Sequence, residues 1–234
     1  MREAGPPKWI WVKAHYRVVM GFFIFPTSAM DGEMKVLITF FIVLILLAVT
    51  PVQSKGATPE ELIKFSSAFF TNLAVHEYGH AIVGSSVGGE GISVTFFSKQ
   101  KNNLFLGYTS TKKLEDKAYP SFALGGEIGA NLSFEYALQS YRKNPSTYNK
   151  ALLFFSGTDF LWYSLYTFYL NNDNPDADPN ILVKETGINK DMILSIAMTQ
   201  SLLNGYRVVS GKDRVVPYFT YNKDSIGFHV KVPF

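Results

Sequence analysis

The chain has 234 residues, of which 47% are hydrophobic, 15% aromatic and only 18% charged, and this composition excludes a disordered protein. The net charge of +3 comes without a run of basic residues, so a nucleic-acid partner is not expected. Cysteine is absent, which excludes disulfides, thiolate metal sites and a cysteine nucleophile. Histidine and carboxylate side chains are therefore the ligands available to a metal ion.

The amino-terminal part of the chain is typical of an export signal. Residues 36–49 are apolar except for one threonine, and they follow Lys35 and precede the small residue Ser54. A positive start, an apolar stretch of roughly 7–15 residues and a small residue at its exit indicate a secretory signal peptide. The stretch is shorter than the roughly 20 residues that a membrane-spanning helix needs. An uncleaved membrane anchor is the alternative interpretation.

The chain is expected to have three parts. Residues 1–33 have no clear role and are interpreted as an upstream segment, with translation starting at Met34. Residues 34–54 form the signal peptide or membrane anchor. Residues 55–234 contain no repeat and no internal linker, so we expect one domain that is exported to the periplasm or cell envelope and associates with a membrane.

Residues 55–234 are predicted to form a mainly helical α+β domain. The first helix begins at Thr58-Pro59, where Glu61 completes a capping box, and it is ended by Gly88-Gly89. The further elements are expected to be a hairpin of strands 92–97 and 104–109, helices 120–141 and 150–170, a plain turn region 171–180, a helix 190–204, and two or three short strands after Tyr206.

The first predicted helix contains the pattern H-E-x-x-H, as His76-Glu77-Tyr78-Gly79-His80. Residues four apart lie on the same helix face, so both imidazoles can bind one zinc ion. Glu77 can reach a water on that ion and act as a general base. The motif lies well inside a capped helix and uses half of the four histidines of the chain. Zinc binding is therefore favoured over a helix whose histidines and glutamate make ordinary hydrogen bonds, and the domain is expected to be zincin-like.

A catalytic zinc site needs a third protein ligand, and a histidine is not expected in that role. His15 precedes the export signal, and His229 shares the polar face of a predicted strand with Lys231. The third ligand is therefore expected to be a carboxylate.

Three carboxylates lie in apolar helices, where a charge is costly unless it is paired or bound to a metal. Asp159 is the first candidate, because it is the only charged side chain between residues 150 and 173. Glu127 is the second, and Glu135 is a further one. A carboxylate that does not bind the ion can still orient a ligand histidine.

Five short motifs follow one another between residues 76 and 160. They are HEYGHAIVG from His76, GISVT from Gly91, LGYT from Leu106, ALGG from Ala123 and SGTDF from Ser156. Their order resembles the peptidase domain of FtsH-type membrane zinc proteases, over roughly residues 70–165. The resemblance implies that His76, His80 and Asp159 hold Zn²⁺, that Glu77 is the general base, and that the substrate is a peptide or an unfolded protein.

The chain departs from that family in ways that affect the interpretation. It has no G-x-x-x-x-G-K-[ST] motif, so the family's ATPase is missing and hydrolysis without ATP is expected. Glu127 stands where the family has an arginine, and Thr158 stands where it has an asparagine. The alternatives are an intramembrane protease of the site-2 type and, from a different class, a non-catalytic envelope protein that retains the motif.

Overall fold

The structure is a computed structural model that describes residues 58–100, 103–170 and 174–232. The predicted upstream segment and the predicted signal peptide or anchor lie outside these residues. The described helices and strands are α2 (Pro59–Ser86), β1 (Ser93–Gln100), β2 (Asn103–Ser110), the 3₁₀ turn η1 (Asp116–Ala118), α3 (Tyr119–Lys143), α4 (Thr147–Gly157), α5 (Asp159–Leu165), the π-helical turn η2 (Tyr166–Leu170), α6 (Asp178–Thr186), α7 (Lys190–Ser210), β3 (Val216–Tyr221) and β4 (Ile226–Lys231).

This arrangement confirms a mainly helical α+β domain with two small antiparallel sheets of two strands each. The first helix starts as predicted, because the Thr58 hydroxyl accepts from the Glu61 backbone N–H while the Glu61 carboxylate accepts from the Thr58 N–H. The predicted hairpin is also confirmed, with Ser93 opposite Ser110 at its base.

Three of the predicted elements differ from the structure. The single helix expected over 150–170 is interrupted at Thr158, which separates α4 from α5, and its last turn is π-helical. The interpretation of 171–180 as a plain turn region is wrong at its end, because α6 begins at Asp178 with Pro179 in its first turn. Helix α7 continues past Gly205 to Ser210, so the carboxy-terminal strands begin only at Val216.

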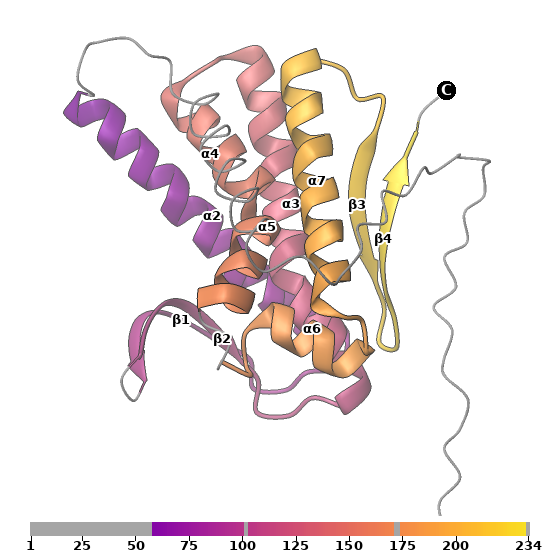
Figure 1. Ribbon diagram of the computed structural model, residues 1–234. Coiled ribbons are helices and arrows are strands. Elements are labelled where there is room, and N and C mark those ends of the chain that lie inside the picture. The colour runs from indigo at the N-terminus through magenta and orange to yellow at the C-terminus, as the bar shows by residue number, and fades with distance from the viewer. Residues whose placement is uncertain (1–57, 101–102, 171–173, 233–234) are drawn as a thin grey trace, which may run out of the picture. The chain divides into compact units, whose positions relative to one another are not determined.

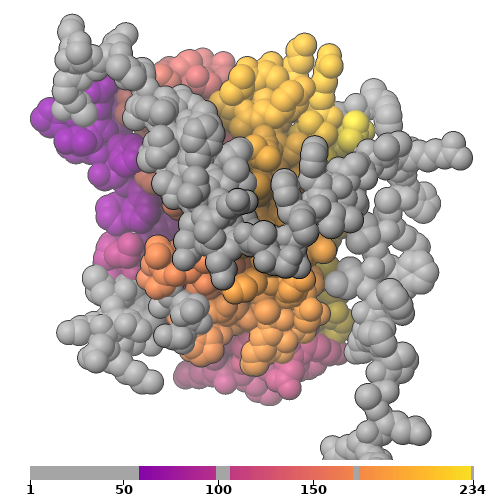
Figure 2. All heavy atoms as spheres, viewed as in Figure 1, coloured from indigo at the N-terminus to yellow at the C-terminus, as the bar shows by residue number. Residues whose placement is uncertain are grey.

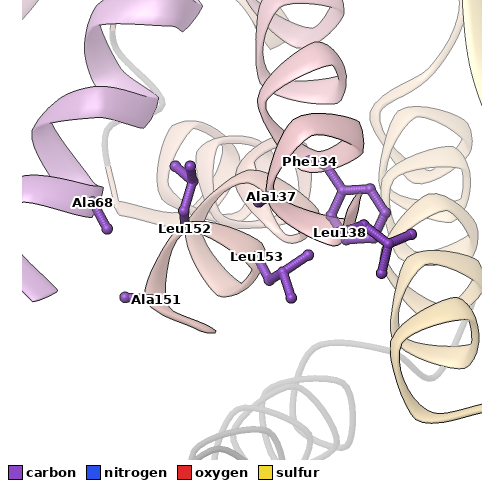
Figure 3. Packing of buried hydrophobic residues seen from close by; sticks show 7 residues of the cluster. All are labelled: Ala68, Phe134, Ala137, Leu138, Ala151, Leu152 and Leu153. Carbon is purple, nitrogen blue, oxygen red and sulfur yellow. The ribbon is translucent and has the colours of Figure 1, made fainter. Parts of the chain in front are cut away.

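The hydrophobic core lies where α2, α3 and α4 pack together (Figure 1). Alanine, leucine and phenylalanine side chains from the three helices meet there and form one buried apolar cluster (Figure 3). The residues of this cluster are Ala68 of α2, Phe134, Ala137 and Leu138 of α3, and Ala151, Leu152 and Leu153 of α4.

Glycines bring α2 and α3 into backbone contact beside the H-E-x-x-H motif. A Cβ atom on Gly79 would lie 2.3 Å from the carbonyl oxygen of Gly125, and one on Gly129 would lie 2.3 Å from the carbonyl oxygen of Val75. Such distances are impossible for a real side chain, so the crossing depends on residues without a Cβ. The crossing places the motif directly against the ALGG segment of α3.

The remaining part of the domain consists of α6, α7 and the β3–β4 hairpin. Helix α6 packs on α3 and α7, and the β3–β4 hairpin packs on α7 and α3 (Figure 1). In the space-filling view the orange atoms of α6 and the first turns of α7 form a continuous layer, with magenta atoms below it (Figure 2). Among the residues that the structure describes, no helix has both the length and the hydropathy for crossing a bilayer.

Candidate metal centre

The two motif histidines lie on the buried face of α2, where the i, i+4 spacing directs both imidazoles to one point. His76 and His80 are both buried, and their Nε2 atoms lie 3.1 Å apart. The neighbouring helix leaves room for them, because Gly126 of α3 has no side chain on this side.

The opposite ring nitrogens fix which tautomer each histidine adopts. Nδ1 of His80 lies 2.7 Å from the carbonyl oxygen of Phe122, and Nδ1 of His76 lies 2.8 Å from Oδ2 of Asp159. A carbonyl can only accept, so the shorter contact favours the hydrogen on Nδ1 of His80, although the Gly126 backbone N–H also points at that atom from 3.2 Å. A carboxylate favours the same tautomer for His76. Both Nε2 atoms are then left with free lone pairs facing each other.

Asp178, the first residue of α6, contributes a third ligand atom at the same point. Its Oδ2 lies 3.1 Å from Nε2 of His80 and 3.6 Å from Nε2 of His76, and the residue is buried. Three atoms with lone pairs, the two Nε2 atoms and Oδ2 of Asp178, therefore face one another. In the neutral tautomers none of the three carries a hydrogen. Such a cluster repels itself unless a proton or a cation lies between the atoms.

The spacing of the three atoms fits a tetrahedral ion. Bonds of about 2.0–2.2 Å to nitrogen and oxygen put neighbouring ligand atoms of a tetrahedron roughly 3.3–3.6 Å apart. The observed separations of 3.1, 3.1 and 3.6 Å are close to this geometry. The buried group of His76, His80 and Asp178 could therefore hold a metal ion.

Asp159, the sequence-based choice for the third ligand, lies on the other side of His76. Its Oδ2 contacts Nδ1 of His76, and its Oδ1 accepts a 2.5 Å hydrogen bond from the side-chain nitrogen of Asn72. The carboxylate is thus held between two side chains of α2, one turn apart. This arrangement orients the His76 ring and favours its Nδ1–H tautomer.

Glu127 is a buried carboxylate that lies close to Asp159 and His76. It is only 1% exposed, and neither of its oxygens has a hydrogen-bond partner within the described part of the chain. The three residues form a second group whose ligand atoms lie within 4.8 Å of one another. Burial raises the pKa of Glu127 well above its usual range, and the nearby charge of Asp159 raises it further.

Glu135, the remaining carboxylate in an apolar helix, is accounted for by an ion pair. Its two oxygens accept hydrogen bonds from the guanidinium of Arg207, which also donates to Asp213. The contact joins α3 to the end of α7, so Glu135 has a structural role.

Glu77, the predicted general base, is buried beside the two histidines and contacts the hairpin. The hydroxyl of Thr109 on β2 lies 2.7 Å from its Oε2 and donates to it. A Cβ atom on Gly107 would lie 2.5 Å from Oε1 of Glu77, so a larger residue at that point of β2 would push the carboxylate aside. The LGYT segment of the hairpin therefore positions the carboxylate.

Charge within the site favours a positive group at its centre. Burial lowers the pKa of His76, but the charge and hydrogen bonds of Asp159 and Asp178 outweigh burial and raise it well above its usual value. Burial likewise opposes ionisation of Asp178, yet His80 and His76 lower the pKa of its carboxyl to about 2. The surrounding carboxylates thus stabilise a proton or a metal ion bound to the histidines.

The raised pKa of His76 predicts that metal binding strengthens with pH. In the metal-free protein the protonated imidazole contributes stability below about pH 6.5, its unfolded value, and this contribution is lost as pH rises through the higher folded value. A metal ion must displace that proton. The rise in melting temperature on adding zinc is therefore expected to be larger at pH 8 than at pH 6. His229→Gln, which removes a half-buried imidazole bonded to Thr220 on the separate β3–β4 hairpin, should leave this difference unchanged. An equal zinc effect at both pH values would contradict the assignment.

Gly126→Ala is predicted to prevent metal binding with little change to the helix that carries it. The added Cβ would lie 2.3 Å from Nε2 of His76 and 2.5 Å from Nε2 of His80, so both imidazoles must move. We expect at least a hundredfold loss of zinc affinity, measured by competition with a chelator. Gly205→Ala on α7, where nothing lies within 4 Å of the added atom, is the matched control and should bind zinc normally.

Sequence reasoning missed Asp178. The residue lies in the stretch NNDNPDADPN, where several Asp and Asn residues indicate a loop and none stands out. The one local signal is Asp178-Pro179, because proline in the first turn marks a helix start after a loop. That signal predicts α6, but not that its first side chain points into the domain.

Neither the sequence nor the structure has a match in comparisons with protein-family models, curated proteins and solved structures. The interpretation of the site therefore depends on its geometry and on the motifs.

Proposed function

We propose that this chain is a zinc-dependent endopeptidase in which His76, His80 and Asp178 hold the ion and Glu77 is the general base. The observation that carries the proposal is the convergence of two Nε2 atoms and one carboxylate oxygen at the spacing of a tetrahedral site. Asp178 takes the place that sequence reasoning assigned to Asp159, and Asp159 orients His76.

The donor set supports zinc. Two imidazoles and one carboxylate form a mixed nitrogen and oxygen set typical of catalytic zinc, whereas Mg²⁺ and Ca²⁺ prefer oxygen ligands. Three protein ligands leave a fourth position for water or substrate. When bound, zinc supplies a Lewis acid that polarises a carbonyl group and lowers the pKa of water.

Glu77 is suited to move the proton in this reaction. It lies next to His76 in the helix, and Thr109 holds its carboxylate in one position. Its carboxylate can accept a proton from the attacking water and pass it to the leaving amine of the peptide. The hydrogen bond from Thr109 leaves the other oxygen, Oε1, for this transfer.

The proposed substrate class and location of the protein rest on features of the sequence. The motifs that resemble the FtsH-type peptidase domain favour peptides or unfolded proteins as substrates, cleaved without ATP. Export to the periplasm or cell envelope depends on residues 34–54. Association with a membrane is consistent with exposed apolar side chains on the outer face of α2 and on the hairpin. These side chains include Ile63, Phe70, Tyr78, Ile82 and Phe97.

The proposal is tested by metal removal. The full chain is incubated with a reduced, alkylated protein and with a library of short fluorogenic peptides, before and after treatment with a zinc chelator. We expect hydrolysis that the chelator abolishes and that about one equivalent of zinc restores, while Mg²⁺ does not restore it. Cleavage that survives complete removal of zinc would contradict the proposal.

A further inference from the structure

Tyr163 lies beside the candidate metal centre, and the proposed function does not use it. It is on α5, one turn after Asp159, and its ring packs edge-on against the His76 ring with the centroids 5.8 Å apart. The two residues of α5 therefore approach the same histidine, one through a carboxylate and the other through an aromatic ring.

The hydroxyl group of Tyr163 lies at the start of α6. Its oxygen accepts a hydrogen bond of 3.4 Å from the backbone N–H of Asp178. In the described ranges, this hydroxyl donates no hydrogen bond of its own. The hydroxyl oxygen of Tyr163 thus accepts a hydrogen bond, and its O–H group remains able to donate one.

The surroundings of the phenol are rich in negative charge. Burial raises the pKa of Tyr163 well above its usual value, and the carboxylates of Asp178, Glu77 and Glu127 act in the same direction. Apart from burial, the largest contributions to the pKa of Tyr163 come from the neighbouring Asp178. A hydrogen-bond donor at this point would stabilise negative charge that develops on a substrate.

During hydrolysis of a peptide bond, such a negative charge develops on the carbonyl oxygen. As the water oxygen bonds to the carbonyl carbon, the π electron pair of the C=O bond moves onto the carbonyl oxygen, and one water proton passes to Glu77. The oxygen that gains charge needs a donor aimed at it, and such a donor accelerates hydrolysis by roughly a hundred- to a thousandfold. The C–N bond then breaks, and the proton on Glu77 goes to the amine.

We propose that Tyr163 is a catalytic residue whose neutral hydroxyl donates a hydrogen bond to the scissile carbonyl oxygen as that oxygen gains negative charge. Tyr163 keeps its proton throughout. The inference rests on the proposed function, because it needs a peptide bound at the site formed by His76, His80 and Asp178.

The test compares the full chain with its Tyr163→Phe variant. Phenylalanine retains the ring that packs on His76 and removes only the hydroxyl. We expect kcat to fall by about a hundredfold while KM changes little, because the lost bond forms in the transition state. Tyr166→Phe, which removes the hydroxyl of a 51% exposed tyrosine three residues further on, is the matched control and should keep normal activity.

A binding measurement gives a second readout that does not require turnover. A phosphinic peptide has a tetrahedral, negatively charged centre that mimics the hydrated carbonyl. Its affinity for the zinc-loaded protein, measured by calorimetry, should fall by about a hundredfold in Tyr163→Phe. Zinc content and melting temperature should match those of the unaltered protein.

The outcomes separate the inference from the proposed function. If the unaltered protein shows no zinc-dependent hydrolysis, the proposed function fails. If it is active and Tyr163→Phe retains kcat and the affinity for the phosphinic peptide within twofold, only the role of Tyr163 is overturned. Loss of zinc from Tyr163→Phe would also overturn it, because the hydroxyl would then serve to hold Asp178 in place.

Discussion

Asp178→Ala is expected to abolish stoichiometric zinc binding, whereas Asp159→Ala is expected to weaken it. Oδ2 of Asp178 faces the Nε2 atoms of both histidines, while Oδ2 of Asp159 faces only Nδ1 of His76. Zinc binding to a structural site with four protein ligands is worth about 10–16 kcal/mol, so an equal share for one ligand is roughly 2.5–4 kcal/mol, or about two to three orders of magnitude in affinity. Removing a group that orients a ligand costs about 10–100-fold.

Elemental analysis of the purified full-length variants, followed by competition with a chelator, measures both effects. Asp176→Ala is the matched control, since Asp176 is exposed and lies two residues before Asp178 in the same segment. It should retain one zinc per chain. The opposite ranking, with zinc lost from Asp159→Ala and retained in Asp178→Ala, would return the third ligand to the residue that the FtsH-type resemblance implies.

Glu77→Gln is expected to retain zinc and to lose hydrolysis by about 10²–10⁴-fold. The glutamine amide has nearly the same shape, and its oxygen can still accept the hydrogen bond from Thr109. It cannot take a proton from water at neutral pH, so the step that depends on a base is lost. The measurement is kcat against a peptide substrate, made beside the zinc content of the same preparation.

Two further variants make this result specific. Glu90→Gln changes an exposed glutamate paired with Lys113, and it should leave both zinc content and kcat unchanged. Gly107→Ala should also retain zinc but lose activity, because its Cβ would displace the Glu77 carboxylate, which lies 2.5 Å away. Full activity in Glu77→Gln would exclude this residue as the general base.

The sequence predicted most of the helices and the first hairpin because their signals are local. The capping box at Thr58 and Glu61, the glycine pair after the first helix and the β-rich segments around 92–109 each act within a few residues. The interruption at Thr158 differs from the single helix expected over 150–170. The stretch Ser156-Gly157-Thr158-Asp159 is small and polar within a mostly apolar segment, but no proline marks the end of a helix there.

The sequence by itself determined that His76 and His80 meet, because the helical repeat places residues four apart on one face. It also placed Glu77 beside them. These relations are confined to a single helix turn and hold in any tertiary arrangement that contains the helix.

Only the tertiary structure decided which carboxylates reach the histidines and which nitrogen each one contacts. Asp159 and Asp178 are 83 and 102 residues from His76 along the chain, and no local pattern relates such positions. Their placement results from the close crossing of α2 and α3 at glycines, the interruption between α4 and α5, and the packing of α6 on α3. The side chain of a residue in a polar loop becomes part of a buried centre only when packing brings it there.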